Sequence, residues 1–148
     1  MVSHSNTYYN QAFTPLLPPL VRTASATSAS FDLQNYDSVA LVVNVGATGD
    51  TLNGTNRVEL QVQESDDNAT FTAVADADLL KVVSGGQAVG TFGILNSGGS
   101  VGQVYLTGYR GNKRYVRVAL ANFGTTSTGT STDVLAIAGR ARTLPINA

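Results

Sequence analysis

A strict alternation of apolar and polar side chains is the feature that most limits how this chain can fold. Between residues 57 and 64 the apolar side chains are those of Val58, Leu60 and Val62, and the residues between them are polar or charged. Residues 114–120 repeat this pattern. Because successive side chains of a β-strand point to opposite faces, the period of two indicates strands that bury one face.

Other segments extend the β-pattern along the chain. Residues 39–45 are apolar on both faces apart from Asn44, which predicts a central strand covered on both sides. Further strands are expected at residues 31–34, 70–75, 79–83, 88–94, 101–107 and 133–142. Clusters of Gly, Ser, Asn and Asp separate these segments, as turns require. Eight or nine short strands predict an all-β fold, most simply a jelly-roll-like antiparallel sandwich of about eight strands.

The first 27 residues depart from this pattern, since they hold three of the four prolines. Proline lacks the N–H that an inner strand donates, so this stretch is predicted to be neither helix nor inner strand. We expect residues 1–27 to form an extended Pro/Ser/Thr-rich N-terminal arm and residues 28–148 to form a β-sandwich body. The arm is either a mobile tail or, as its aromatic and aliphatic content favours, a segment lying across a neighbouring subunit. Its expected anchors are Tyr8, Tyr9, Phe13, Leu16, Leu17 and Leu20.

Composition removes several functional classes. The 148 residues include no cysteine and a single histidine, His4, within the predicted arm. This excludes a disulfide framework, a thiolate metal site and a zinc site with two imidazoles. With no oriented histidine and no thiol nucleophile, we expect no enzyme activity and no cofactor. The start of the chain lacks the basic and apolar regions of a signal peptide, and no apolar run is long enough to cross a membrane, so synthesis in a cytosol is expected.

Acidic residues gather in one part of the sequence. Five of them lie within fifteen positions: Glu64, Asp66, Asp67, Asp76 and Asp78. Carboxylates in neighbouring loops suit calcium, and a facing pair suits a glycosidase. The spacing does not follow the EF-hand pattern, and the run from Asp66 to Asn68 is also what an ordinary hairpin turn contains. A turn is therefore favoured, and calcium binding stays open.

Charge is divided unevenly between the two ends of the chain. Residues 1–80 carry two basic and nine acidic residues, a net −7, whereas residues 110–148 carry six basic and one acidic residue, a net +5. Patches of opposite sign can contact a partner or another copy, or they can pair within the monomer. The basic residues near Tyr109 and Tyr115 also permit contacts with single-stranded nucleic acid, but the overall charge of −1 argues against that function.

Two stretches resemble a known class of proteins. Residues 60–74 contain a strand, a Glu-Ser-Asp-Asp turn and a Thr-Phe strand, and residues 111–118 contain Gly-Asn-Lys-Arg-Tyr-Val-Arg. Together with residues 31–39, they resemble small virion proteins of tailed bacteriophages and gene transfer agents. The resemblance covers roughly residues 30–142 and rests on structural rather than catalytic motifs.

This resemblance implies a non-enzymatic virion protein that stabilises the capsid as a cement or decoration protein on its exterior. The implied partners are the major capsid protein and further copies of the chain, as a homotrimer or homodimer, without nucleic acid or membrane. We expect the arm and a basic patch to make the contacts, and the patch consists of Arg110, Lys113, Arg114 and Arg117. The alternatives are a head-spike or fibre base, or a carbohydrate-binding module for host recognition. A carbohydrate site would depend on the body tyrosines Tyr36, Tyr105, Tyr109 and Tyr115.

Overall fold

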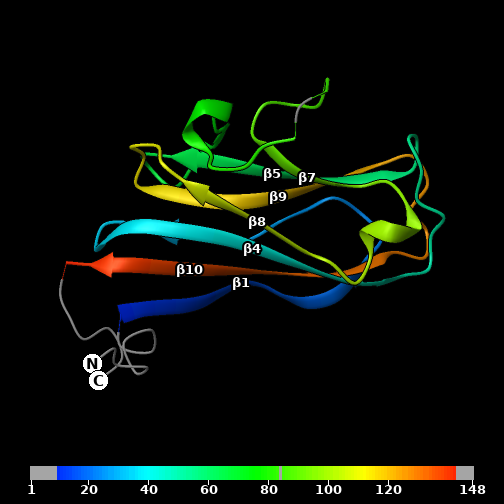
Figure 1. Cartoon of the computed structure of the whole chain (residues 1–148), viewed down its shortest axis with the longest axis horizontal. Helices are drawn as coiled ribbons and strands as arrows, with labels where there is room; N and C mark the ends of the chain where they lie inside the picture. The colour runs from blue at the N-terminus through cyan, green and yellow to red at the C-terminus, as the bar shows by residue number, and fades with distance from the viewer. Residues whose placement is uncertain (1–9, 84, 143–148) are drawn as a thin grey trace, which may run out of the picture.

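The computed structural model describes residues 10–83 and 85–142, and these form two antiparallel β-sheets (Figure 1). The first, here called the β4 sheet, has the order β1-β10-β4-β8. Its strands are β1 (Gln11–Arg22), β10 (Thr130–Ala141), β4 (Tyr36–Thr48) and β8 (Val104–Tyr109). Figure 1 shows β1, β10 and β4 side by side along the long axis of the molecule.

The second sheet, here called the β5 sheet, is built around β5 (Arg57–Ser65) and β9 (Tyr115–Phe123). The short strands β2 (Ala26–Thr27) and β3 (Phe31–Asp32) both pair with β9, while β6 (Thr72–Ala73) and β7 (Thr91–Leu95) pair with β5. Two short 3₁₀ helices, η1 (Asp76–Asp78) and η2 (Gly98–Ser100), lie in the connections. None of the helices in the described ranges is long and apolar enough to span a membrane.

The strand pairing is that of a jelly roll. With β2 and β3 taken as one interrupted strand and β6 as an addition, eight strands remain. The first pairs with the eighth (β1 with β10) and the second with the seventh (β2 and β3 with β9). The third pairs with the sixth (β4 with β8) and the fourth with the fifth (β5 with β7). These nested antiparallel pairs, divided between two sheets, confirm the predicted jelly-roll sandwich.

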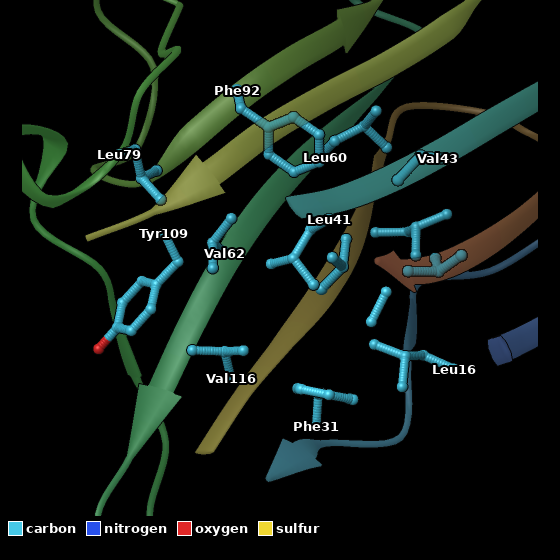
Figure 2. Close-up of a cluster of buried hydrophobic side chains, with 14 of the residues drawn as sticks. Leu16, Phe31, Leu41, Val43, Leu60, Val62, Leu79, Phe92, Tyr109 and Val116 are labelled. Atoms are coloured by element: carbon cyan, nitrogen blue, oxygen red, sulfur yellow. The ribbon is translucent and has the colours of Figure 1, made fainter. Parts of the chain in front are cut away.

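The hydrophobic core fills the space between the sheets (Figure 2). Leu41 of β4 faces Leu60, Val62 and Val116 of the β5 sheet, and all four are fully buried. Phe92 of β7 is the largest of the fully buried side chains. The predicted strands at 57–64 and 114–120 are confirmed as β5 and β9, whose inner residues supply much of this core.

The predicted N-terminal arm is wrong from Gln11 onward. Residues Gln11–Arg22 form β1, which pairs with β10 of the same chain, so the first strand of the jelly roll lies inside the segment predicted to extend away from it. β1 tolerates its prolines because it is an edge strand, and its register shifts between Pro15 and Leu20. Residues 1–9, with the predicted anchors Tyr8 and Tyr9, lie outside the described residues.

Three other expectations are corrected. Residues 39–45 do form the centre of β4, but the alternate residues Ala40, Val42 and Asn44 are only half-buried, so the strand is covered fully on one face. Residues 79–83 form no strand; Leu79 makes a single bridge to Tyr109, and its neighbours follow the edge of β8. The expected strand at 70–75 is reduced to β6.

Candidate functional site

A cleft of about 470 Å³ opens at one end of the sandwich. It lies where β5, β8 and β10 end and where β4 and β9 begin, because antiparallel strands bring these ends together. The segments around it are the β3–β4 connection, the β8–β9 connection, the residue after β5 and the residue after β10. Its lining side chains and glycine are Leu33, Gln34, Tyr36, Asp37, Ser38, Val39, Asp66, Tyr109, Arg110, Gly111, Asn112, Lys113, Arg114 and Arg142.

Tyr109 joins this cleft to the core. Its ring is buried at the margin of the core cluster, and its hydroxyl points away from the other core side chains (Figure 2). The hydroxyl donates a hydrogen bond of 2.5 Å to Glu64 and accepts one of 2.9 Å from the backbone N–H of Lys113. Burial, followed by the hydrogen bond to Glu64, raises the pKa of Tyr109 well above its usual value of 10.0. The phenol therefore fixes the β8–β9 connection as a neutral group.

Three cations of the basic C-terminal third form ion pairs with carboxylates of the acidic first half. Arg114 makes two hydrogen bonds to Asp32, of 2.9 and 2.7 Å, which lower the pKa of that carboxyl below 3.8 and raise the pKa of the guanidinium. Lys113 lies 2.5 Å from Asp66, whose carboxylate raises the pKa of the ammonium. Arg142 lies 3.4 Å from Asp37. Three of the six cations in residues 110–148 thus pair with carboxylates within the monomer.

The four predicted basic residues do not form one patch. Arg110, Lys113 and Arg114 line the cleft. Arg110 forms no ion pair within the described ranges, and its guanidinium donates to the backbone oxygen of Ala77 at 2.7 Å. Arg117 instead lies on the outer face of the β5 sheet, where it donates to Gln63 at 2.9 Å and its guanidinium stacks 3.8 Å from the centre of the Phe71 ring.

The predicted arm anchors also separate. Leu16 is buried in the core and Leu17 packs against it, so neither is available to a partner in the folded chain. Phe13 and Leu20 are 52% and 59% exposed. Regular alternation would place residues four positions apart on one face, as Leu16 and Leu20 are. The register of β1 instead shifts between Pro15 and Leu17 and again between Leu17 and Leu20, so these residues do not keep the same face.

Carboxylates of the acidic cluster accept hydrogen bonds that hold loops in place, and one of them forms an ion pair. Asp67 accepts hydrogen bonds from the backbone N–H groups of Thr70 and Ala69 and from the Ser65 hydroxyl, which lower its pKa to about 2. Asp76 accepts from the backbone N–H of Gly90. Within residues 10–83 and 85–142, no three His, Cys, Asp or Glu side chains gather in a group able to hold a metal ion.

The tyrosines expected to support a carbohydrate site are not strongly exposed. Tyr109 is buried, and Tyr36, Tyr105 and Tyr115 are half-buried. Tyr36 packs against Phe31 with ring centres 5.4 Å apart, and the hydroxyl of Tyr105 donates to the backbone of Ser100. No open aromatic platform stands among these four residues.

Several cleft residues were not singled out from the sequence, namely Leu33, Asp37 and Arg142. Each lies just outside or at the end of a strand, where alternation carries no signal. Only the strand topology shows that residues 33–39 and 142, which are a hundred positions apart, border the same cleft.

Comparisons with known proteins identify the fold alone. No family model matches this chain, and no curated protein matches it either. Among solved structures, the chain is similar to the SPBc2 prophage-derived protein YomS, with a TM-score of 0.50 and 14% sequence identity. The similarity covers 87% of this chain and 92% of YomS. The β-sandwich described above is thus also that of a prophage-derived protein.

Proposed function

We propose that this chain is a bacteriophage virion protein that binds the outside of the capsid as a cement protein. The observation that carries the proposal is the jelly-roll fold, which extends over most of the prophage-derived protein YomS. The resemblance of residues 60–74 and 111–118 to small phage virion proteins supports it independently. A cement protein performs no chemistry and stabilises the capsid by burying surface against it, repeated over many copies.

The cleft is the part of this fold best suited to contact a polar capsid surface. Its cations remain accessible, since Lys113, Arg114 and Arg142 have side chains 38%, 45% and 66% exposed. Exposed ion pairs are worth only about 0–1 kcal/mol each. A capsid carboxylate can therefore replace Asp66 or Asp37 at small cost, and Arg110 is available to form a new pair.

The test uses heads of the phage that encodes this chain, assembled without it. Purified full-length protein is added back, and occupancy is measured by gel densitometry and by electron cryomicroscopy. We expect the chain to decorate the heads at many regularly spaced sites and to raise the temperature at which they rupture. Absence of binding would overturn the proposal, and binding only at single vertices would indicate a spike or fibre base instead.

A charge reversal tests the cleft separately. Arg110→Glu places a carboxylate at the cleft, whereas the matched control Lys81→Glu changes the charge equally at an exposed residue that does not line it. We expect Arg110→Glu to lower head occupancy at least about tenfold, because like charges at an interface repel, and Lys81→Glu to leave it unchanged. Equal occupancy of the two variants would show that the capsid contact lies elsewhere.

A further inference from the structure

The outer face of the β4 sheet is apolar across all four strands. In one row the residues directly opposite one another are Pro15 of β1, Leu135 of β10, Val42 of β4 and Leu106 of β8. These residues alternate with the buried core positions, so their side chains point away from the core. Leu106 is 51% exposed.

The next row continues the same surface. It consists of Phe13, Ile137, Ala40 and Gly108, again in register on the four strands. A side chain at Gly108 would meet Leu80, so Leu80 covers the end of this row and is itself 67% exposed. The two rows form what we call the apolar face, which consists of Phe13, Pro15, Ala40, Val42, Leu80, Leu106, Leu135 and Ile137.

The outer face of the β5 sheet is more polar, with a charged or amide side chain in each of three successive rows. There Glu59 lies opposite Ala121, Gln61 opposite Ala119, and Gln63 opposite Arg117. A half-exposed antiparallel sheet is expected to be apolar inside and polar outside. The β5 sheet obeys this rule and the β4 sheet does not, which marks the apolar face as a surface that another molecule covers.

No side chain of the apolar face carries a charge. The adjacent row contains Asp133, but the amide of Asn44 donates to its carboxylate at 2.9 Å. In a two-fold interface each surface meets its own copy, so any charge near the axis faces the same charge. An uncharged face suits contact with a second copy of itself. A face that bound a different protein by electrostatic complementarity would be expected to carry charged side chains.

We propose that the apolar face binds the same face of a second copy, forming a two-fold homodimer with the two β4 sheets stacked. The whole outer side of the β4 sheet, which includes the rows beside the apolar face, has an area of about 700 Å² per copy, given ~3.3 Å per residue and ~4.8 Å between strands. A stable interface buries about 800 Å² per partner. One copy of this sheet therefore offers close to the area that a specific dimer requires.

The edges of the same sheet do not favour the alternative of strand addition. β1 carries Pro15, Pro18 and Pro19, which cannot donate backbone hydrogen bonds to an added strand. At the other edge, Leu79 bridges Tyr109 and the backbone N–H of Leu80 donates to Gly108, so the end of β8 is covered. Association through this sheet is thus expected face to face.

The first experiment measures the mass of the full chain by analytical ultracentrifugation. We expect twice the 15.4 kDa of one chain. Leu106→Glu places a carboxylate on the apolar face of each copy and is expected to raise the dimer dissociation constant at least about a hundredfold. Val89→Glu is the matched control, because Val89 is similarly exposed, at 53%, and lies off the face. Circular dichroism confirms that both variants stay folded.

Each other outcome overturns the proposal in a defined way. A monomeric full chain that dimerises only after removal of residues 1–9 would show that its own N-terminal segment covers the face. A monomer in which Leu106→Glu abolishes head binding would assign the face to the capsid. An oligomer that Leu106→Glu leaves intact would be held by another surface. Because mass is measured without capsids, failure here is distinguishable from failure of the proposed cement function.

A second experiment tests the stacking geometry. The chain contains no cysteine, so a single introduced thiol is the only site of cross-linking. A short bifunctional thiol cross-linker is expected to join two copies of Val42→Cys, at the centre of the apolar face. Gln61→Cys, on the outer face of the β5 sheet and also half-buried, is expected to stay monomeric on the same gel. Equal cross-linking of both variants would contradict the arrangement.

Discussion

The hydroxyl of Tyr109 lies 2.5 Å from a carboxylate oxygen of Glu64 and accepts a hydrogen bond from the backbone of Lys113. One phenol thereby joins the end of β5 to the connection between β8 and β9. The same contact fixes the position of the cleft wall on which Lys113 lies. Gly111 packs so closely on the Tyr109 ring that a methyl group there would lie about 2.4 Å from its oxygen.

Replacing Tyr109 by Phe should lower the free energy of unfolding by roughly 1.5–3 kcal/mol at pH 7, the usual cost of losing a hydrogen bond to a charged group. Urea denaturation measures this change. The wild-type contribution is complete below pH 10, the pKa of tyrosine in the unfolded chain, and is lost as pH rises above it because the folded pKa is raised. The two stability curves should therefore converge above pH 10, and parallel curves would contradict the assignment.

Leu16 and Leu20 were predicted as equivalent anchors, and the structure separates them. Leu16 is 5% exposed in the core, so Leu16→Ala should cost about 2–4 kcal/mol in urea denaturation. Leu20 is 59% exposed, so Leu20→Ala should change stability by less than about 0.5 kcal/mol. Equal and small effects would show that β1 is not part of the folded body.

Gly90 is expected to resist substitution. Its φ of +80° is unfavourable for other residues, and a methyl group would lie 2.8 Å from the backbone oxygen of Val74. Gly90→Ala should destabilise the chain by about 2–4 kcal/mol. Gly98 has open space around its Cβ position, so Gly98→Ala is the control and should be neutral within about 1 kcal/mol in thermal and urea unfolding.

Asp67 should stabilise its turn only while it is ionised. Hydrogen bonds from Thr70, Ala69 and Ser65 lower its pKa from 3.8 to about 2. Its contribution is present above pH 3.8 and is lost as pH falls toward 2. The melting temperature of Asp67→Ala should therefore lie below that of the wild type at pH 7 and approach it near pH 2. Asp67→Asn keeps an acceptor oxygen. Its melting temperature should lie between those of the wild type and Asp67→Ala at pH 7, and the side chain at position 67 should add no pH dependence.

The strands with one buried face were predictable, because alternation directly records which side chains avoid water. β5 and β9 follow this pattern. The turn around Asn68 was predictable from its residue types, and Asn68 has a left-handed φ of 58°. β1 was missed because its prolines indicate a segment without backbone pairing. An edge strand needs only one side of its backbone to pair, and the sequence does not state which strands are edges.

The candidate site was predicted only in part, since Arg110, Lys113 and Arg114 line the cleft while Arg117 lies on another face. Both Arg114 and Arg117 belong to the alternating segment 114–120. In the structure β9 begins only at Tyr115, so Arg114 lies before the strand, where its guanidinium donates to Asp32. Which acidic residue meets which basic residue depends on contacts between residues 47, 82 and 105 positions apart. Local sequence carries no record of such pairs.

The sequence alone determined that this is an all-β sandwich, that the chain lacks thiols and paired histidines, and that its charges divide between two ends. Only the tertiary structure decided that three of the C-terminal cations pair within the monomer, that β1 closes the jelly roll, and that two rows on the outer side of the β4 sheet are apolar. The reason is physical. Burial on one face leaves a pattern along each strand, whereas the surface formed by four neighbouring strands exists only once their order and register are fixed.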